Sequence, residues 1–599
     1  MIRDRPLARR HLGLGLRPGL AAALSVAAAA LFPYLGSLFD PPILDDGRAA
    51  LENPLVHGLR NAGRIFANPS GHSGAPSVRG LYRPLTTLSY ALNWSVHRGF
   101  LPGFHAVNLA LHAASSVLVS LLAFRLARAG VPARAGRVSL LAGLLFALHP
   151  AHVEAVVTIS GRAELLSTLC ALLALLLALP GLGSPVHLAL STLVLALGIL
   201  SEEMAAMTPA LFLLVAAGLP SAAGLPAPPG LRRGEARRAL FRAVGAAVVL
   251  CLAVLPYALL GRPSGATLPR FFPLATPVTH IALTMSRVLF EYLRILVFPS
   301  FLGGPFAYAD RIPTLSAPTF GFAVATFVWM GVLAAGVLLL RRAPLAGVGL
   351  VFVFLALLPV LQIVPLGVLL EERLLYLPSV GFCLLAASAL AALLPEPTKD
   401  RTPQWSPSAA LRAGAVAAVL LALFARTVVR TRDFTSELSF WESELGRAPY
   451  DAVVNSNLGM AYVARGEPEK AIPRLEAALA AHPGYWRAWM YLGIARDELA
   501  ERPASRAAFE EAMRLAPAES DPPRFMARML RRAGDLDGAI SALEKARRSS
   551  PEEAVLAREL AAALLEAGRP DEARDTLREA IRLDPGDLAA GAELSRLPP

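Results

Sequence analysis

The sequence predicts an all-α chain in two parts, a polytopic membrane domain followed by a soluble superhelix of short helical repeats. Three observations predict it. Hydrophobic residues make up 55% of the 599 residues, charged residues only 17%, and the mean hydropathy is +0.51, which excludes an ordinary soluble protein. The net charge is +19 over residues 1–432 and −7 over residues 433–599. The second part also repeats itself every 34 residues.

The membrane part is predicted from its apolar stretches. A bilayer core about 30 Å thick needs about 20 helical residues for one crossing. About eleven stretches fit, at about 19–39, 104–124, 138–158, 163–180, 186–201, 203–219, 239–260, 319–340, 344–364, 374–394 and 409–427. Segment 281–299 is not counted, because Arg287, Glu291 and Arg294 are costly inside a bilayer and suit a helix lying at its surface. The alternative is that it crosses, which would invert the topology of every later span.

Arginine clusters set the expected orientation. The first span follows Arg3, Arg5, Arg9, Arg10 and Arg17, so we expect a retained signal anchor with a cytoplasmic N-terminus. Alternating crossings then place the basic clusters at 125–137, 232–238, 341–342 and 399–401 on the cytoplasmic side. The loops 40–103, 261–318 and 365–373, the tight turns near 159–162 and 202, and the repeats fall outside. These clusters explain the basic excess, so no nucleic-acid partner is expected.

The compartment is inferred from composition. Only three of the 57 basic residues are Lys, and the chain is rich in Ala, Gly and Pro, which is typical of a GC-rich bacterial genome. We therefore expect an integral protein of the bacterial inner membrane with extracytoplasmic repeats.

The repeats follow from self-comparison at an offset of 34. Pro483, Pro517, Pro551 and Pro585 recur, as do Ala478, Ala512, Ala546 and Ala580, and Leu475, Phe509, Leu543 and Leu577. Small residues between two helices, a turn Gly and a closing Pro match the tetratricopeptide pattern. We expect a membrane domain at 1–430, a connecting partial repeat at 431–452, four repeats at 453–588 and a tail at 589–599. Such an array usually binds a protein or peptide on its concave face.

The adjacent Asp45 and Asp46 follow the first span. Such a pair can supply a general base or hold a divalent cation that screens phosphate. A plain turn before Gly47 is the simpler alternative for these residues. No cofactor is firmly indicated, and metal binding stays open.

Other chemistry-bearing side chains gather at the expected outer ends of the spans. His149 and His152 are three residues apart, a spacing that suits an anion or, less well, a metal. Arginine binds phosphate in a bidentate way, which makes Arg83, Arg162 and Arg373 phosphate candidates; snorkelling or an ion pair of Arg373 with Glu372 is the alternative. The supporting candidates are His105, Glu154, Glu164 and Glu372.

Several of these segments resemble one family, the membrane O-mannosyltransferases that carry tetratricopeptide repeats and their bacterial relatives, within the class C glycosyltransferases. The similar segments are LDDGRAALENPLV (44–56), YRPLTTLSYALN (82–93), FHAVNLALHA (104–113), LFALHPAHVEAVVTISGRAELLS (145–167), SEEMAAMTP (201–209), EERLLYLPSVGF (371–382) and RTRDFTSELSFWESEL (430–445).

The resemblance implies transfer of a sugar, typically mannose, from a polyprenyl-phosphate carrier in the membrane to a hydroxyl acceptor outside, with inversion. By motif, Asp45 would be the base and Asp46 its support, while Arg83, His149, His152, Arg162 and Arg373 would line the carrier phosphate. Relatives tend to have Lys where this chain has Glu202, which puts one phosphate contact in doubt. The alternative function is a non-catalytic membrane scaffold that assembles an envelope complex through its repeats; a transporter is disfavoured because the polar residues gather at the span ends.

Overall fold

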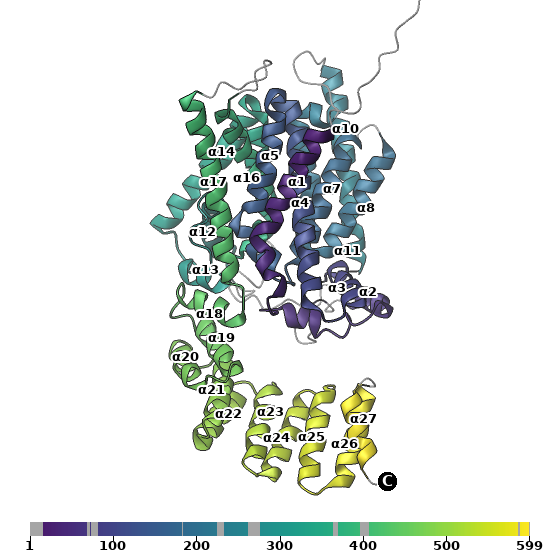
Figure 1. The fold of residues 1–599 in the computed structure, drawn as a ribbon, viewed down its shortest axis with the longest axis vertical. Coiled ribbons are helices and arrows are strands. Elements are labelled where there is room, and N and C mark those ends of the chain that lie inside the picture. The colour runs from purple at the N-terminus through teal and green to yellow at the C-terminus, as the bar shows by residue number, and fades with distance from the viewer. Residues whose placement is uncertain are drawn as a thin grey trace, which may run out of the picture. The chain divides into compact units, whose positions relative to one another are not determined.

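The computed structural model describes residues 16–68, 72, 82–181, 184–223, 233–260, 276–362, 369–395, 406–584 and 587–597. Every element within these residues is helical (Figure 1). The N-terminal arginines 3–10, Arg232, Lys399, Arg401 and Pro585, on which parts of the sequence analysis depend, lie outside them. The chain divides into two compact units, residues 1–436 and 437–599.

The first unit is a bundle of apolar helices. All eleven expected stretches are helical: α1 (Leu16–Leu31) with η1 (Phe32–Phe39), α4 (Leu101–Gly130), α5 (Ala135–Leu148) with α6 (Val153–Val157), α7 (Arg162–Gly181), α8 (Pro185–Ser201), α9 (Thr208–Gly218), α10 (Arg233–Cys251) with α11 (Leu255–Leu260), α14 (Phe320–Arg342), α15 (Pro344–Leu357), α16 (Pro378–Leu393) and α17 (Pro407–Arg432). By length and composition six of the described helices can cross a membrane, or seven if one pair bent by 50° forms a single span. Four further apolar helices are shorter.

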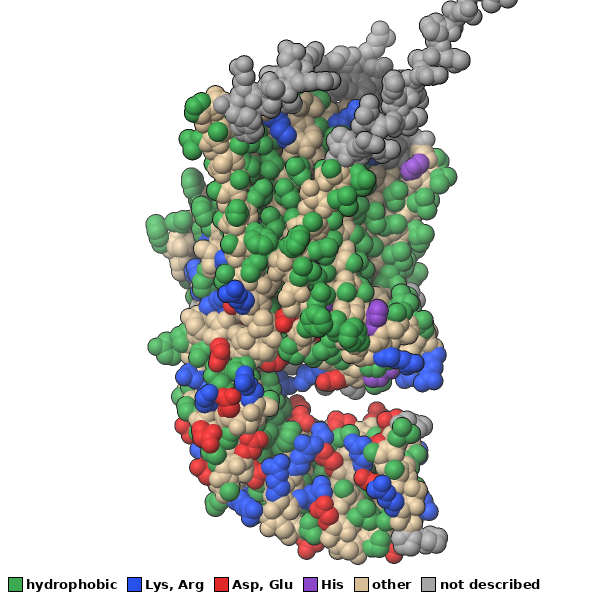
Figure 2. All heavy atoms as spheres, in the orientation of Figure 1, with side chains coloured by type: hydrophobic (Ala, Val, Ile, Leu, Met, Phe, Trp, Pro, Cys, Tyr) green, Lys and Arg blue, Asp and Glu red, His purple; other side chains and the backbone are tan. Residues whose placement is uncertain are grey.

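Proline and glycine set the limits and spacing of these helices. Proline occupies the first turn of α4, α8, α15, α16 and α17, where the missing N–H would lack an intrahelical partner in any case. Helices α15 and α16 are in contact through their backbones. A Cβ added to Gly349 would lie only 2.6 Å from the carbonyl oxygen of Gly381, so glycine is needed at this crossing. Small residues allow such close contact between membrane helices. Figure 2 shows apolar side chains covering the visible flank of this unit.

Helix α12 (Val278–Val297) contains the segment expected not to cross. It is 20 residues long but contains Arg287, Glu291 and Arg294, and it is not among the described helices whose length and composition allow them to cross a membrane. Tyr292 Oη accepts a bond of 3.4 Å from the Glu371 amide, and the Leu296 carbonyl lies 3.1 Å from His149 Nε2. Earlier in the helix, Thr284 Oγ1 accepts a bond of 2.8 Å from the Leu315 amide, which precedes α14. Ser286 also accepts a bond of 2.9 Å from Trp329 Nε1, within α14, so α12 contacts both an apolar helix and the segments that join such helices. That α12 does not cross the membrane stays a prediction.

The second unit consists of paired antiparallel helices. The pairs are α19 (Ala452–Ala464) with α20 (Pro468–Ala481), α21 (Trp486–Glu498) with α22 (Arg502–Leu515), α23 (Asp521–Arg532) with α24 (Leu536–Ser549), and α25 (Ala554–Glu566) with α26 (Pro570–Leu583). Helix α18 (Glu437–Leu445) precedes them and α27 (Leu588–Arg596) follows. The expected tail at 589–599 therefore contains most of a helix, whose Ala590 is buried in the core of the array.

The repeat positions found in the sequence have structural roles. Gly466, Gly534 and Gly568 have φ values of 71°, 80° and 71°, in the region that favours glycine. Gly493 lies against the ring of Phe509, which a Cβ would approach to 2.8 Å. The 34-residue pattern thus encodes the turn inside three of the four helix pairs, while the second pair has Ala500, with a φ of 59°, at the same position. At Gly493 the pattern also encodes the contact between the two helices of a pair.

Candidate active site

The loop with Asp45 and Asp46 leaves the end of η1 and is anchored on the bundle. Leu44 has a φ of 54°, and the helical turn Gly47–Leu51 follows. Ala49 and Ala50 pack with Tyr90 of α3 (Pro84–His97), Phe104 and Ile159 in one buried cluster. The loop is therefore fixed against segments far away in the sequence.

The two adjacent aspartates lie in different environments. Asp46 is 1% exposed; its Oδ1 accepts a bond of 2.8 Å from the Ser160 amide and its Oδ2 one of 3.3 Å from the Ile43 amide. Burial raises the pKa of Asp46 to about 6, although these amide bonds oppose the shift. Asp45 is exposed, and its carboxylate makes no hydrogen bond within the described residues. Of the pair, only Asp45 is open to a substrate.

Arg373 is surrounded by carboxylates. Its guanidinium lies 2.6 Å from Glu371, 3.4 Å from Glu164 and 3.8 Å from Glu154. Its main-chain amide also donates to Glu154 over 3.2 Å. Burial alone would lower the pKa of Arg373, but Glu371, Glu164, Glu154 and Asp45 raise it well above its ordinary value. Arg373 therefore pairs with Glu371, and not with Glu372 as the alternative from the sequence has it.

Arg83 is the second cation of this site. Its Nη2 lies 3.2 Å from Glu203 and 3.7 Å from Glu202. Burial raises the pKa of Glu202 to about 8, with Glu164 adding to the shift and Arg83 opposing it. Two polar atoms here are buried with no hydrogen-bond partner among the residues that the structure describes, Nε of Arg83 and Oε2 of Glu164. Glu202, which stands where relatives tend to have Lys, thus lies beside Arg83, one of the predicted phosphate ligands.

Sequence reasoning missed four residues of this cluster as site candidates: His72, Glu202, Glu203 and Glu371. His72 is 7% exposed, and burial, together with Arg83 and Arg373, lowers its pKa to about 3. It is therefore neutral, and its Nδ1 lies 3.4 Å from Thr87 Oγ1. Glu371 directly precedes the predicted residues Glu372 and Arg373, and this position was the sequence signal that it belongs to the site. His72 had none, because the sequence around it, NPSGHSGAPS (68–77), matches no motif.

Arg162 is fully buried inside the protein. It donates to Asn108, Asn93 and the carbonyl of Phe104 over 2.8, 3.0 and 2.9 Å. Its guanidinium also lies 4.8 Å from the ring centre of Tyr90. Arg162 thus joins the first turn of α7 to α3 and α4, and the structure does not bring it to an open phosphate position.

The predicted histidines are also internal. His149 and His152 are both 0% exposed. His149 accepts a bond from the Ala151 amide and lies 3.1 Å from the Leu296 carbonyl; His152 lies 2.9 Å from the Phe146 carbonyl and 2.8 Å from Ser379 Oγ. Both ring nitrogens of each therefore have protein partners. His105, 1% exposed, lies 3.2 Å from the Asp40 carbonyl and supports the loop that leads to Asp45.

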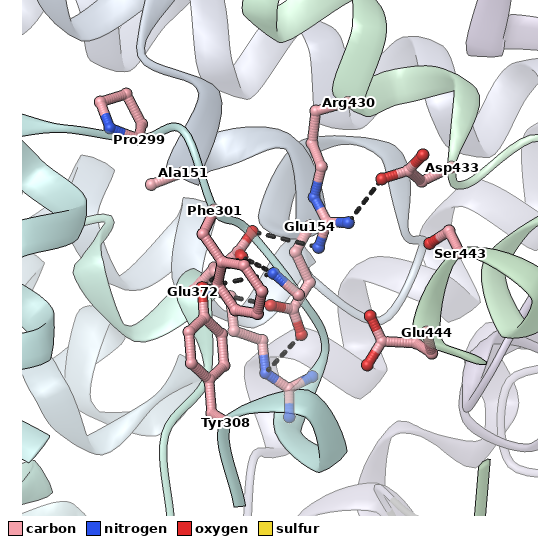
Figure 3. A network of polar contacts seen from close by, with 12 residues as sticks. Ala151, Glu154, Pro299, Phe301, Tyr308, Glu372, Arg430, Asp433, Ser443 and Glu444 are labelled. Atoms are coloured by element: carbon pink, nitrogen blue, oxygen red, sulfur yellow. Dashed lines mark hydrogen bonds and ion pairs between the residues drawn. The ribbon is translucent and has the colours of Figure 1, made fainter. Parts of the chain in front are cut away.

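Glu372 belongs to a separate buried network at the end of α17. Its Oε1 accepts bonds of 2.6 Å from the Gly303 amide and 2.8 Å from Tyr308 Oη, and its Oε2 lies 3.2 Å from Arg430. Arg430 also pairs with Asp433 over 2.7 Å. Figure 3 shows Arg430 between Glu372 and Asp433, with Glu154 close to Glu372. Because Glu372 precedes Arg373, this network holds the short turn η10 (Glu372–Leu375) that carries Arg373.

The arrangement combines an exposed carboxylate, two arginines and a surplus of buried carboxylates at one place. Arginines can hold a phosphate, and carboxylates can accept hydrogen bonds from sugar hydroxyl groups. Within the described residues no group of three or more His, Cys, Asp or Glu side chains has the arrangement of a metal site.

Comparisons with known proteins agree with both parts of the chain. Tetratricopeptide repeat family models match residues 456–520 and 530–597. Protein O-mannosyl-transferase F38B6.6 of Caenorhabditis elegans is 26% identical over 490 residues, which cover 79% of this chain and 64% of that protein. Protein O-mannosyl-transferase TMTC1 of Homo sapiens is 28% identical over 551 residues, covering 83% and 59%. Protein O-mannosyl-transferase Tmtc1 of Drosophila melanogaster is 40% identical over 174 residues, covering 27% and 19%.

The chain spans less than two thirds of the length of these curated relatives. The resemblance stated from the sequence motifs is confirmed. Over about four fifths of its length, this chain is a homologue of proteins named protein O-mannosyl-transferases, and its C-terminal part consists of tetratricopeptide repeats.

Proposed function

We propose that this chain is an integral-membrane glycosyltransferase that moves a sugar, mannose by preference, from a polyprenyl-phosphate carrier to a hydroxyl group of a protein on the extracytoplasmic face. The observation that carries the proposal is the convergence of Asp45 with Arg83, Arg373 and buried carboxylates beside an apolar helical bundle. The homology to proteins named O-mannosyl-transferases supports the reaction class.

Asp45 is the base in this proposal. Its carboxylate takes the proton of the acceptor hydroxyl, whose oxygen then attacks the anomeric carbon of the sugar. The bond from that carbon to the phosphate oxygen breaks, and polyprenyl phosphate leaves with the electron pair. Attack on the side opposite the leaving phosphate inverts the configuration. Asp46 positions Asp45, because its own oxygens are committed to the Ser160 and Ile43 amides.

Arg83 and Arg373 stabilise the charge that develops on the leaving phosphate. Fixed cations in a partly dry site do this better than water, since they need no reorganisation during the reaction. Both now pair with carboxylates, so the phosphate must compete with them. A protonated Glu202, whose pKa is about 8, lessens that competition near neutral pH. His149, His152 and Arg162 act through the framework in this proposal, and His105, Glu154, Glu164 and Glu372 position the loops.

The test is transfer from polyprenyl-phosphate mannose to acceptor protein in proteoliposomes. Asp45→Asn is expected to lower kcat by about a hundredfold to ten-thousandfold, the usual contribution of a general base. Its fold should be unaffected, because the side chain is exposed. Arg287→Gln, on α12 and outside the cluster, is the matched control and should leave the rate within about twofold. An unchanged rate for Asp45→Asn would contradict the role of Asp45.

The scaffold alternative has its own signature. It predicts that deletion of residues 446–599 abolishes the cellular phenotype, whereas Asp45→Asn has no effect on it. Transfer that is lost in Asp45→Asn, with the repeats intact, excludes a purely non-catalytic role.

A further inference from the structure

The first helices of consecutive repeats are connected by ion pairs. Arg532 of α23 lies 2.9 Å from Asp497 of α21. On the other side, Arg524 donates through two nitrogens to both oxygens of Glu559 of α25, each over 2.8 Å. Arg531 of α23 donates to Glu566 of α25, with 3.0 Å between its Nε and Oε2. The partners are 35 residues apart, so α21, α23 and α25 lie in a row.

Helix α23 differs from the other first helices in its charge. It carries four Arg and one Asp, a net charge of +3. The net charge of α19 and of α21 is zero, and that of α25 is −1. Figure 2 shows basic side chains gathered over α23 and its pair α24. The array as a whole is acidic, with −7 over residues 433–599, so α23 forms a local basic segment in it.

Arg528 also pairs with Glu559, as Arg532 does with Asp497, and these two arginines are more exposed than the carboxylates. The side chains of Arg528 and Arg532 are 44% and 64% exposed, whereas those of Glu559 and Asp497 are 17% and 8% exposed. Each of these two guanidinium groups uses a single nitrogen for its ion pair. Since a guanidinium has five N–H donors, Arg528 and Arg532 each have N–H groups beyond those in these ion pairs, on side chains that solvent reaches.

A hollow adjoins these donors. It has a volume of about 490 Å³ and is lined by Arg528, Arg531, Arg532 and Glu566. Its lining has three arginines and one glutamate, while Glu559 and Asp497, which pair with Arg528 and Arg532, are more deeply buried than these arginines. Arg528 also lies 5.1 Å from the ring centre of Phe525, so an aromatic surface adjoins the basic one.

We propose that the exposed face of α23 with this hollow, here the α23 basic surface, docks an acidic segment of a partner protein. Carboxylates of such a segment would accept bonds from the outward N–H donors of Arg528 and Arg532, because charge-assisted bonds between arginine and carboxylate are strong and directional. A nucleic acid is disfavoured, because nucleic-acid binding relies on a basic surface that extends over a domain, whereas the basic charge here is confined to α23 within an array of net charge −7. This inference concerns binding and stands or falls independently of the proposed sugar transfer.

The test measures binding of fluorescent peptides to the full chain in nanodiscs by anisotropy. Two 12-residue peptides are used, one with alternating Glu and Ser, the other with alternating Gln and Ser. The Glu peptide is expected to bind at least about tenfold more tightly at 50 mM salt and to weaken as salt rises, since exposed charges are screened. Equal binding of the two peptides would overturn the proposal.

Paired variants locate the surface. Arg528→Gln with Arg532→Gln is expected to weaken binding of the Glu peptide about tenfold. The matched control is Arg506→Gln with Arg578→Gln, which removes the same charge from exposed positions on the second helices α22 and α26 and should change affinity less than about twofold. Equal losses in the two double variants would show a general charge effect and overturn the proposal.

A charge-conserving variant separates docking from folding. Arg528→Lys with Arg532→Lys keeps both charges but replaces the guanidinium donors, so its affinity for the Glu peptide should lie between those of the parent and of the Gln double variant. Binding no tighter than that of the Gln double variant, with unchanged circular dichroism, would show that the two cationic charges contribute nothing to recognition and would contradict the proposal.

Discussion

The buried pair of Arg430 and Glu372 offers the sharpest test of how the site is held. Both side chains are 0% exposed, and their closest atoms are 3.2 Å apart. Arg430→Met removes the cation while keeping apolar volume. Removal of one partner of a buried pair typically costs about 3–5 kcal/mol, because the other charge stays buried without compensation.

The structure places the expected cost at the low end of that range. Glu372 keeps its bonds from the Gly303 amide and Tyr308 Oη, at 2.6 and 2.8 Å, and hydrogen bonds to charged groups contribute about 1.5–3 kcal/mol each. Asp433, a second partner of Arg430, is 20% exposed and can be hydrated. We therefore expect Arg430→Met to lower the free energy of unfolding by about 3 kcal/mol.

The assay is denaturant unfolding in detergent micelles, followed by tryptophan fluorescence and combined with a double-mutant cycle. Glu372→Gln in the Arg430→Met background removes the unpaired charge, so the double variant should lose about 2 kcal/mol less than the sum of the single variants. Arg426→Met is the matched control one turn earlier on α17, where the guanidinium contacts the carbonyls of Pro299 and Ser300; we expect a loss of about 1 kcal/mol. A loss below about 1 kcal/mol for Arg430→Met, with additive effects in the cycle, would refute the reasoning.

Three further predictions follow from single contacts. Because the pKa of Glu202 is raised from 4.5 to about 8, its contribution to stability is complete below pH 4.5 and is lost as pH rises through about 8. Glu202→Gln should therefore flatten the fall in Tm between about pH 5 and 8, and an unaltered pH profile would contradict this shift. Gly381→Ala should destabilise by about 1–3 kcal/mol, since its Cβ would meet the backbone of Gly349, while Gly414→Ala, with nothing within 4 Å, should not destabilise; equal Tm values for the two variants would oppose the close contact. Arg162→Lys should cost about 2–4 kcal/mol, because one ammonium cannot reach acceptors on both α3 and α4, and a Tm within 1 °C of the parent would argue against its bracing role.

The fold could be predicted to a large extent because it depends on local periodicity. The eleven apolar stretches and the 34-residue repeat each reflect a pattern that every segment carries by itself. The predicted ends of the helices were less exact where a helix contains polar residues. The last repeat, for example, is followed by α27, whose polar outer positions gave no sign of a helix that covers the array.

The candidate site was predicted only in its outline. Asp45, Arg83 and Arg373 were identified by residue type and position, and they do share one electrostatic environment. Their partners could not be read from spacing, because Glu371 and Glu372 are adjacent yet face different arginines. Which of two neighbours turns to which side depends on the path of η10 between α15 and α16.

The sequence by itself determined the two-part architecture, the apolar segments, the repeat period and the inventory of charged residues, since composition and periodicity are properties of each segment alone. The tertiary structure decided which charges are free. It left Asp45 exposed and buried Asp46 on the Ser160 amide, and it enclosed His149, His152 and Arg162 completely. The physical reason is that a buried polar group must find a partner, and partners from distant segments meet only once the helices have packed.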